Sequence, residues 1–230
     1  MKKLNTIFFI FLMTVSCAQE KESVKYANSI TINDLKDLLS IYSSDDFEGR
    51  QTGTQGDRTA ANFLREFYIN NQIEPALNTI DYFQPYQLNL PGEMYTRNYT
   101  FPEKLRAYNR YSEGVNFVDT QNVASIIKGE IYPDSYLIIT GHLDHVGIDG
   151  DEVYNGADDN GSGTVSILEI AQAFQEAVED GVRPKRSVVF LHVSGEEEGL
   201  LGSEYYVNNS LYPLEDTFAT LNLDMIGLSL

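Results

Sequence analysis

Two short and almost wholly apolar segments in the second half of the chain place the tightest constraint on its fold. They span residues 135–140 and 187–193, and apolar runs of this length are typical of strands buried on both faces of a parallel sheet. Apolar residues at helical spacing follow over 162–178 and 199–208, and a further strand is expected over 218–224. Alternating strands and helices predict an α/β fold, here a three-layer α/β/α sandwich with a mostly parallel mixed sheet.

The first half of the chain carries weaker patterns. Apolar spacing predicts helices over 33–43 and 57–70, and residues 122–128 are predicted to form another strand. Residues 82–118 are rich in Tyr and Asn and are interrupted by three prolines, so we expect irregular edge structure or an insertion there. The simplest organisation is a single domain over residues 32–230.

The start of the chain has the pattern of an export signal. Residues 1–18 combine two lysines with an apolar segment that is too short to span a bilayer, which predicts a signal peptide. Its end resembles a bacterial lipoprotein box, in which Cys17 would be acylated and tether the protein to a membrane; ordinary cleavage after Ala18 is the alternative. A polar tether is expected over 19–31. We therefore expect an exported bacterial protein, located in the periplasm, on the outer membrane or outside the cell.

Charge and cysteine content exclude several functions. The chain has 34 acidic and 16 basic residues, a formal net charge of −18, which disfavours a nucleic-acid partner. Cys17 is its only cysteine, so neither a disulfide within the chain nor a cysteine-based zinc site can form. Any metal must be bound by oxygen and imidazole.

Four polar clusters follow predicted strands or the loops after them, where open α/β sheets place their sites. They are 141–145 (Gly-His-Leu-Asp-His), 155–163 (Asn-Gly-Ala-Asp-Asp-Asn-Gly-Ser-Gly), 194–199 (Ser-Gly-Glu-Glu-Glu-Gly) and 222–224 (Asn-Leu-Asp). Carboxylates gathered at one sheet edge raise one another's pKa and cost stability unless a cation neutralises them. Two divalent metals about 4 Å apart would neutralise them and would also form a hydrolytic site.

The spacing within two of these clusters fits a metal site. His142 and Asp144 lie two residues apart and point to one side of an extended segment, so one can bind metal while the other orients it or its neighbour. Glu196 and Glu197 lie on a glycine-flanked turn, where both can face one cavity. One of them would then bind metal while the other accepts the proton of a metal-bound water.

Other polar residues have different interpretations. We expect His192 to be packed within its apolar strand, and His145 to line the cleft without binding metal. Residues 158–169 imitate the calcium-binding loop of an EF-hand. Four glycines within residues 141–157 leave no room for the helix that precedes such a loop, so we do not favour calcium binding.

The four clusters together resemble the M28 family of zinc aminopeptidases in its secreted bacterial form. The resemblance covers roughly residues 32–227, and this range includes Phe-Glu-Gly-Arg at 47–50. Its most specific segments are Gly-His-Leu-Asp-His, Asn-Gly-Ala-Asp-Asp-Asn-Gly-Ser-Gly, Gly-Glu-Glu-Glu-Gly-Leu-Leu-Gly-Ser and Asn-Leu-Asp-Met-Ile-Gly. It implies the zinc-peptidase, phosphorylase/hydrolase-like version of the α/β/α fold.

The resemblance also implies a role for each matching site residue. Asp159 would bridge two zinc ions, His142 and Asp224 would complete the first zinc site, and Glu197 would bind the second zinc. Glu196 would be the general base of a peptidase that removes N-terminal residues from peptides or proteins, using water activated by the two zinc ions.

Two further features follow from the same resemblance. Asp144 would support His142 from behind, and the Asp159–Asn160 peptide bond is a candidate for a cis bond. A further histidine, downstream of the last Asp motif, would complete the second zinc site.

The chain departs from that pattern at its end. It stops six residues after Asp224, and its only histidines are at 142, 145 and 192. We therefore expect a C-terminally truncated form with an incomplete sheet, a second zinc site without its histidine and impaired activity. A glutaminyl cyclase-like zinc enzyme and an inactive metal-binding remnant are the alternatives.

Overall fold

The structure is a computed structural model that describes residues 23–89 and 117–227. Its main element is a six-stranded sheet in the order β1-β3-β7-β4-β8, with β2 also paired to β3. The strands are β1 (Glu74–Pro75), β2 (Phe83–Asn89), β3 (Phe117–Ile127), β4 (Tyr132–His142), β7 (Arg186–Val193) and β8 (Thr217–Asn222). The strands β7, β4 and β8 run parallel, whereas β1, β2 and β3 add antiparallel pairings, so the sheet is mixed.

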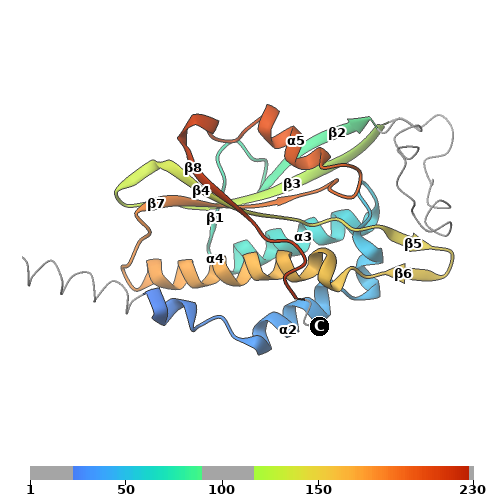
Figure 1. The fold of residues 1–230 in the computed structure, drawn as a ribbon, viewed down its shortest axis with the longest axis horizontal. Coiled ribbons are helices and arrows are strands. Elements are labelled where there is room, and N and C mark those ends of the chain that lie inside the picture. The colour runs from blue at the N-terminus through green and yellow to red at the C-terminus, as the bar shows by residue number, and fades with distance from the viewer. Residues whose placement is uncertain (1–22, 90–116, 228–230) are drawn as a thin grey trace, which may run out of the picture.

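Helices cover both faces of this sheet, which gives the three layers seen in Figure 1. On one face lie α2 (Ile32–Tyr42), α3 (Gln55–Asn70) and α4 (Gly163–Glu179), and on the other lies α5 (Leu201–Asn208). Shorter elements are the turns η1 (Asp45–Arg50), η4 (Ala157–Ser162) and η5 (Leu214–Asp216) and the hairpin of β5 (Gly147–Asp149) and β6 (Glu152–Tyr154). The α/β/α sandwich expected from the sequence is confirmed.

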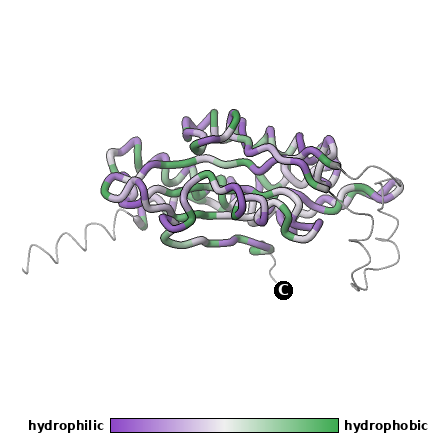
Figure 2. The backbone as a smooth tube through the Cα atoms, turned by 90° about the horizontal axis from the view of Figure 1, so that it is seen from above, coloured by the Kyte–Doolittle hydropathy of each residue, from purple (hydrophilic) through white to green (hydrophobic). Residues whose placement is uncertain are grey.

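The central strands bury both of their faces. Along β7, Val188 and Phe190 belong to the core beneath α2, α3 and α4, whereas Val189 and Leu191 belong to the core on the side of α5. This is why the segment is apolar at almost every position. The helices α2 and α3 alternate exposed residues with buried or half-buried ones, whereas α4 is buried or half-buried along almost its whole length. Figure 2 shows the mixture of hydrophobic and hydrophilic residues along the described chain.

One expectation for the first half of the chain was wrong. Residues 83–89, expected to be irregular, form β2, which pairs with β3 over its whole length. Pro85 is tolerated because β2 lies at the edge of the sheet. The helix expected over 33–43 is confirmed as α2, which begins at Ile32 because the side chain of Thr31 accepts a hydrogen bond from the backbone of the first turn.

The described part of the expected tether packs on the domain. Residues 23–27 are helical, and the buried Tyr26 donates a hydrogen bond to Asp180, which follows α4. The expected signal peptide over 1–18, with Cys17, lies outside the described residues. Among the residues that are described, no helix has the length and apolar character needed to span a membrane.

Candidate metal centre

The candidate site lies at the carboxyl ends of β4, β7 and β8, which are adjacent and parallel. His142 is the last residue of β4, Glu196 and Glu197 follow β7, and Asp224 follows β8. Asp159 lies in η4, the turn that leads into α4. The structure therefore brings together five predicted site residues from four segments that are far apart in sequence. Their roles as ligands and base stay predictions.

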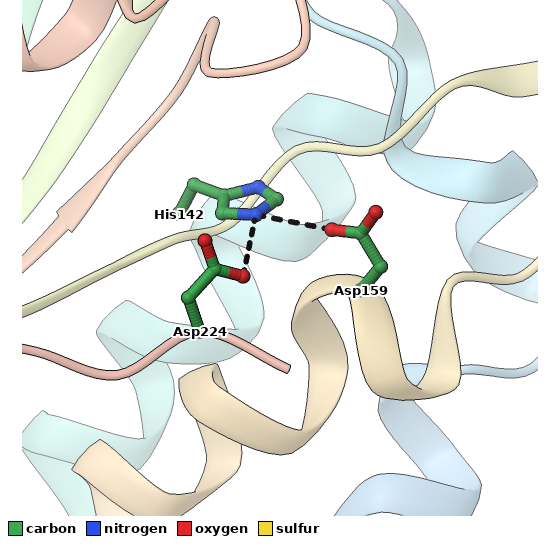
Figure 3. Close-up of side chains that lie close together, drawn as sticks. All are labelled: His142, Asp159 and Asp224. Atoms are coloured by element: carbon green, nitrogen blue, oxygen red, sulfur yellow. Dashed lines mark ion pairs between the residues drawn. The ribbon is translucent and has the colours of Figure 1, made fainter. Parts of the chain in front are cut away.

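Three of these residues form a set that we call the first triad: His142, Asp159 and Asp224 (Figure 3). His142 Nε2 lies 3.2 Å from Asp159 Oδ1 and 3.5 Å from Asp224 Oδ1. Zinc binds such atoms at about 2.0–2.2 Å in tetrahedral geometry, which sets two ligand atoms about 3.4 Å apart. The imidazole is buried and the two carboxylates are partly exposed, so an ion could enter from solvent. The first triad therefore fits zinc in both donor type and spacing.

Asn160 holds the two carboxylates of the first triad in place. Its side-chain amide donates to the carbonyl of Leu223 at 2.8 Å, and its Oδ1 accepts from the backbone N–H groups of Gly163 and Met225 at 3.1 and 3.2 Å. These bonds join η4 to the segment after β8. A Cβ atom on Gly163 would lie 2.3 Å from Asn160 Oδ1, so only glycine fits there. The Asp159–Asn160 peptide bond is cis, as the resemblance implied.

Asp144 connects the ends of β4 and β7. Its fully buried carboxylate accepts hydrogen bonds from the backbone N–H groups of Glu196 and Glu197, at 3.2 and 3.3 Å. His142 Nδ1 lies 3.1 Å from the main-chain carbonyl of Asp144 and 3.7 Å from its carboxylate. Because a carbonyl only accepts, Nδ1 carries the hydrogen and Nε2 is free to bind metal. Asp144 thus orients His142 through its main chain and the glutamate turn through its side chain.

A second group of potential ligands, which we call the second triad, shares Asp159 with the first. It consists of His145, Asp159 and Glu197, whose ligand atoms all lie within 4.8 Å of one another. His145 Nδ1 lies 2.7 Å from Glu197 Oε1. His145 therefore does more than line the cleft, and the sharing of Asp159 is the arrangement that a bridging carboxylate requires.

The electrostatics of the cluster indicate a site that attracts positive charge. Burial alone would lower the pKa of His142, but hydrogen bonds to Asp144 and Asp159 and nearby negative charges outweigh it and raise that pKa to about 11. The hydrogen bond from His142 lowers the pKa of Asp159. Burial raises the pKa of Glu196; the positive charge of His142 opposes this rise, and the charge of Glu197 adds to it. Because histidine binds metal only when neutral, an ion at the first triad would displace the proton from His142.

Arg50 supports the loops of the site from the buried side, a role that the sequence did not lead us to expect. The side chain is fully buried and its guanidinium lies over the Tyr42 ring. It donates to the carbonyls of Leu143, Tyr42, Asn155 and Gly156 at 2.7–3.1 Å. These carbonyls belong to the segment that carries His142 and His145, to the end of α2 and to the loop that leads into Asp159. In the sequence, Arg50 stood out only as the last residue of the Phe-Glu-Gly-Arg segment at 47–50, to which no role was assigned.

Two further predictions concern His192 and residues 158–169. His192 is fully buried and its Nε2 lies 2.6 Å from the Tyr68 hydroxyl, so its predicted packing is confirmed. The β5–β6 hairpin precedes residues 158–169, and Glu169, which would end an EF-hand loop, is buried in α4. The calcium-loop interpretation is therefore excluded on geometry.

The fold matches those of a zinc aminopeptidase and a glutaminyl cyclase. The zinc aminopeptidase BSAP from Bacillus subtilis superposes with a TM-score of 0.57 at 18% identity, covering 85% of this chain and 69% of that structure. A glutaminyl cyclase from Porphyromonas gingivalis gives 0.57 at 18% identity, covering 86% and 60%. At this identity the two structures establish the fold.

Sequence similarity adds the family. Aminopeptidase NAALADL1 from Rattus norvegicus is 32% identical over 140 residues, which are 58% of this chain and 17% of that relative. The chain thus spans less than a fifth of the length of this relative. The model of peptidase family M28 matches residues 122–229, a range that contains every member of both triads. Residues 122–229 of this chain therefore belong to peptidase family M28.

Proposed function

We propose that this chain is the zinc-binding part of an aminopeptidase that releases N-terminal residues from peptides. The observation that carries the proposal is the first triad, in which one imidazole nitrogen faces two carboxylates at 3.2 and 3.5 Å at the end of the sheet. The M28 match over the same residues and the aminopeptidase name of the rat relative support a peptide substrate. Two zinc ions, with Asp159 shared between them, are part of the proposal.

Zinc in such a site polarises a carbonyl group and makes a bound water more acidic. The residues of this chain would do the rest. Glu196 Oε2 lies 4.0 Å from His142 Nε2, so it is next to the first triad without belonging to it. Its raised pKa suits a carboxylate that accepts a proton from the attacking water and returns it to the leaving amine. Asp144 fixes the backbone of Glu196 and thereby the position of this proton acceptor.

The experiment compares peptides that differ only at the N-terminus. The zinc-loaded chain is incubated with a peptide that has a free amine and with its acetylated form, and products are identified by mass spectrometry. We expect zinc-dependent release of the first residue from the free peptide alone. Glu196→Gln should reduce the rate at least about a hundredfold, whereas Glu204→Gln, a matched change of an exposed glutamate on α5, should not. Hydrolysis that survives Glu196→Gln or zinc chelation would refute the proposal.

The same assay distinguishes the cyclase alternative, which one structural neighbour favours. A peptide that begins with glutamine would then lose ammonia and keep its length, whereas an aminopeptidase shortens it. Zinc binding with neither product would instead identify a metal-binding remnant.

Export and membrane attachment are a separate part of the proposal and rest on the sequence of residues 1–18. Labelled palmitate should be incorporated into the protein when it is expressed in a bacterium, and Cys17→Ala should abolish the labelling. Labelling that survives this substitution would exclude Cys17 as the acylated residue.

A further inference from the structure

The residue before the glutamate turn is hydrogen-bonded at every polar atom. That residue, Ser194, is fully buried between β7 and the glutamate turn, which comprises residues 195–199. Its backbone N–H donates to Asn122 Oδ1 at 3.1 Å, and its carbonyl accepts from the Tyr86 hydroxyl at 2.7 Å. Its hydroxyl donates to Asp57 Oδ1 at 2.8 Å. Strands β2 and β3 and helix α3 therefore all hold the point at which the turn begins.

Asp57 is a buried acid whose partners are all neutral. It lies in the first turn of α3, and its side chain is fully buried. Besides Ser194, its carboxylate accepts from the Gly53 N–H at 3.0 Å, the Thr120 hydroxyl at 2.8 Å and the Gln121 amide at 3.3 Å. Burying a carboxylate without a cation is unfavourable unless hydrogen bonds satisfy its oxygens. Asp57 meets that condition by joining three segments: the loop before α3, strand β3 and the start of the glutamate turn.

Asp57 and Asp144 hold the glutamate turn together. Asp144 accepts from two backbone N–H groups within the turn, at 3.2 and 3.3 Å, whereas Asp57 binds the residue before it. Adjacent residues of the loop before α3 join the two acids, because the Thr52 hydroxyl donates to Asp144 at 3.0 Å and the Gly53 N–H donates to Asp57. The backbone of the turn is therefore fixed at its start and along its length by one connected set of buried hydrogen bonds.

We propose that Asp57 is a positioning residue for Glu196, acting through Ser194. The inference rests on the proposed function, which makes Glu196 the proton acceptor. A competing role for Asp57 is structural only: a carboxylate in the first turn of α3 that accepts from the preceding loop stabilises the helix. The two roles differ in the importance of one bond. Ser194→Ala removes that bond and leaves Asp57 its other three donors.

The first readout is amide hydrogen exchange at Glu196 and Glu197, measured by NMR on the chain in buffer that contains zinc. We expect Ser194→Ala to accelerate exchange of both amides at least about tenfold, because the turn opens more often without its anchor. Ser187→Ala is the matched control: Ser187 is also buried on β7, but it lies at the other end of the strand and donates to the Pro133 carbonyl at 2.6 Å. The control should keep both rates within about twofold of wild type. Equal rates in the two variants would overturn the inference.

A double-mutant cycle tests whether Asp57 acts through Ser194. Asp57→Ala should accelerate exchange as much as Ser194→Ala does, and the double variant should be no faster than either, because all three break one link. Additive effects would overturn the inference. Thr120→Val keeps it testable if Asp57→Ala does not fold, because it removes the other hydroxyl near Ser194 Oγ, at 3.0 Å, and keeps the bond to Asp57. Exchange as fast in Thr120→Val as in Ser194→Ala would assign the anchoring to Thr120 instead.

The second readout is the steady-state kinetics of peptide hydrolysis. A proton acceptor acts in the transition state, so Ser194→Ala should lower kcat at least about tenfold and leave KM within about twofold of wild type. Ser187→Ala should change neither. A higher KM with an unchanged kcat in Ser194→Ala would contradict the positioning of Glu196. Absence of hydrolysis in wild type would refute the proposed function, while amide exchange would still decide whether Asp57 holds the glutamate turn.

Discussion

Removing the guanidinium of Arg50 should destabilise the domain and loosen the metal centre together. The side chain makes four hydrogen bonds of 2.7–3.1 Å to buried or partly buried carbonyls from three segments. A hydrogen bond to a charged group contributes about 1.5–3 kcal/mol, so four give roughly 6–12 kcal/mol before the cost of burying the charge. That cost is several kcal/mol. We therefore expect Arg50→Met to lower the free energy of unfolding by about 3–5 kcal/mol.

Urea unfolding followed by circular dichroism measures this loss. With a slope of about 2 kcal/mol per molar urea, the midpoint should fall by roughly 2 M. Arg50→Lys keeps the charge but cannot reach all four carbonyls, so its midpoint should lie between those of wild type and Arg50→Met. Arg58→Met removes an exposed arginine with one backbone contact, and its free energy of unfolding should stay within about 0.5 kcal/mol of wild type. Equal midpoints for the two methionine variants would show that the buried bonds of Arg50 do not support the fold.

Three further predictions concern pH and packing. Burial raises the pKa of Asp57 to about 7, so the native state keeps a proton that the unfolded chain loses near pH 4. The free energy of unfolding should therefore fall by up to about 4 kcal/mol as pH rises from 4 to 7. Unfolding curves of Asp57→Asn should lack this pH dependence, and an unchanged pH dependence would contradict the raised pKa of Asp57. Burial lowers the pKa of His192 to about 3, so the unfolded chain takes up a proton below pH 7 that the native state does not. The free energy of unfolding should therefore fall by about 3 kcal/mol between pH 7 and pH 4. In urea unfolding of wild type and His192→Asn, the variant should lack this loss. Gly163→Ala would place a Cβ atom 2.3 Å from Asn160 Oδ1 and 2.4 Å from the Leu223 carbonyl oxygen. Because these contacts position the first triad, zinc titration should show that the variant binds zinc at least about tenfold more weakly. A zinc affinity equal to that of wild type would show that these contacts do not position the first triad.

The sequence predicts the core strands because a strand buried on both faces needs an apolar side chain at almost every position. Residues 136–139 and 188–191 are apolar or aromatic at consecutive positions, and they lie within β4 and β7 respectively. The polar clusters that follow them converge because parallel strands bring their carboxyl ends to one edge. The residue pattern therefore predicts that His142 and Asp224 lie at the same edge of the sheet, whereas the adjacency of β4 and β8 comes from the structure.

Features that depend on distant partners could not be predicted in the same way. The strand at 83–89 exists because β3 supplies its hydrogen bonds, and Pro85 obscures its pattern. Arg50 acts on carbonyls about 90 to 105 residues away in sequence, which no local spacing reveals. The contact between His145 and Glu197 is equally remote, and the histidine alone looked like a residue that merely lines a cleft.

Anomalous X-ray diffraction from zinc-soaked crystals of the chain tests the central claim most directly. Data collected on both sides of the zinc absorption edge locate the ion without any assumption about its ligands. The geometry of the first triad predicts a peak about 2.0–2.2 Å from His142 Nε2 and from carboxylate oxygens of Asp159 and Asp224. Zinc bound only at surface carboxylates, with no peak among these three residues, would contradict it.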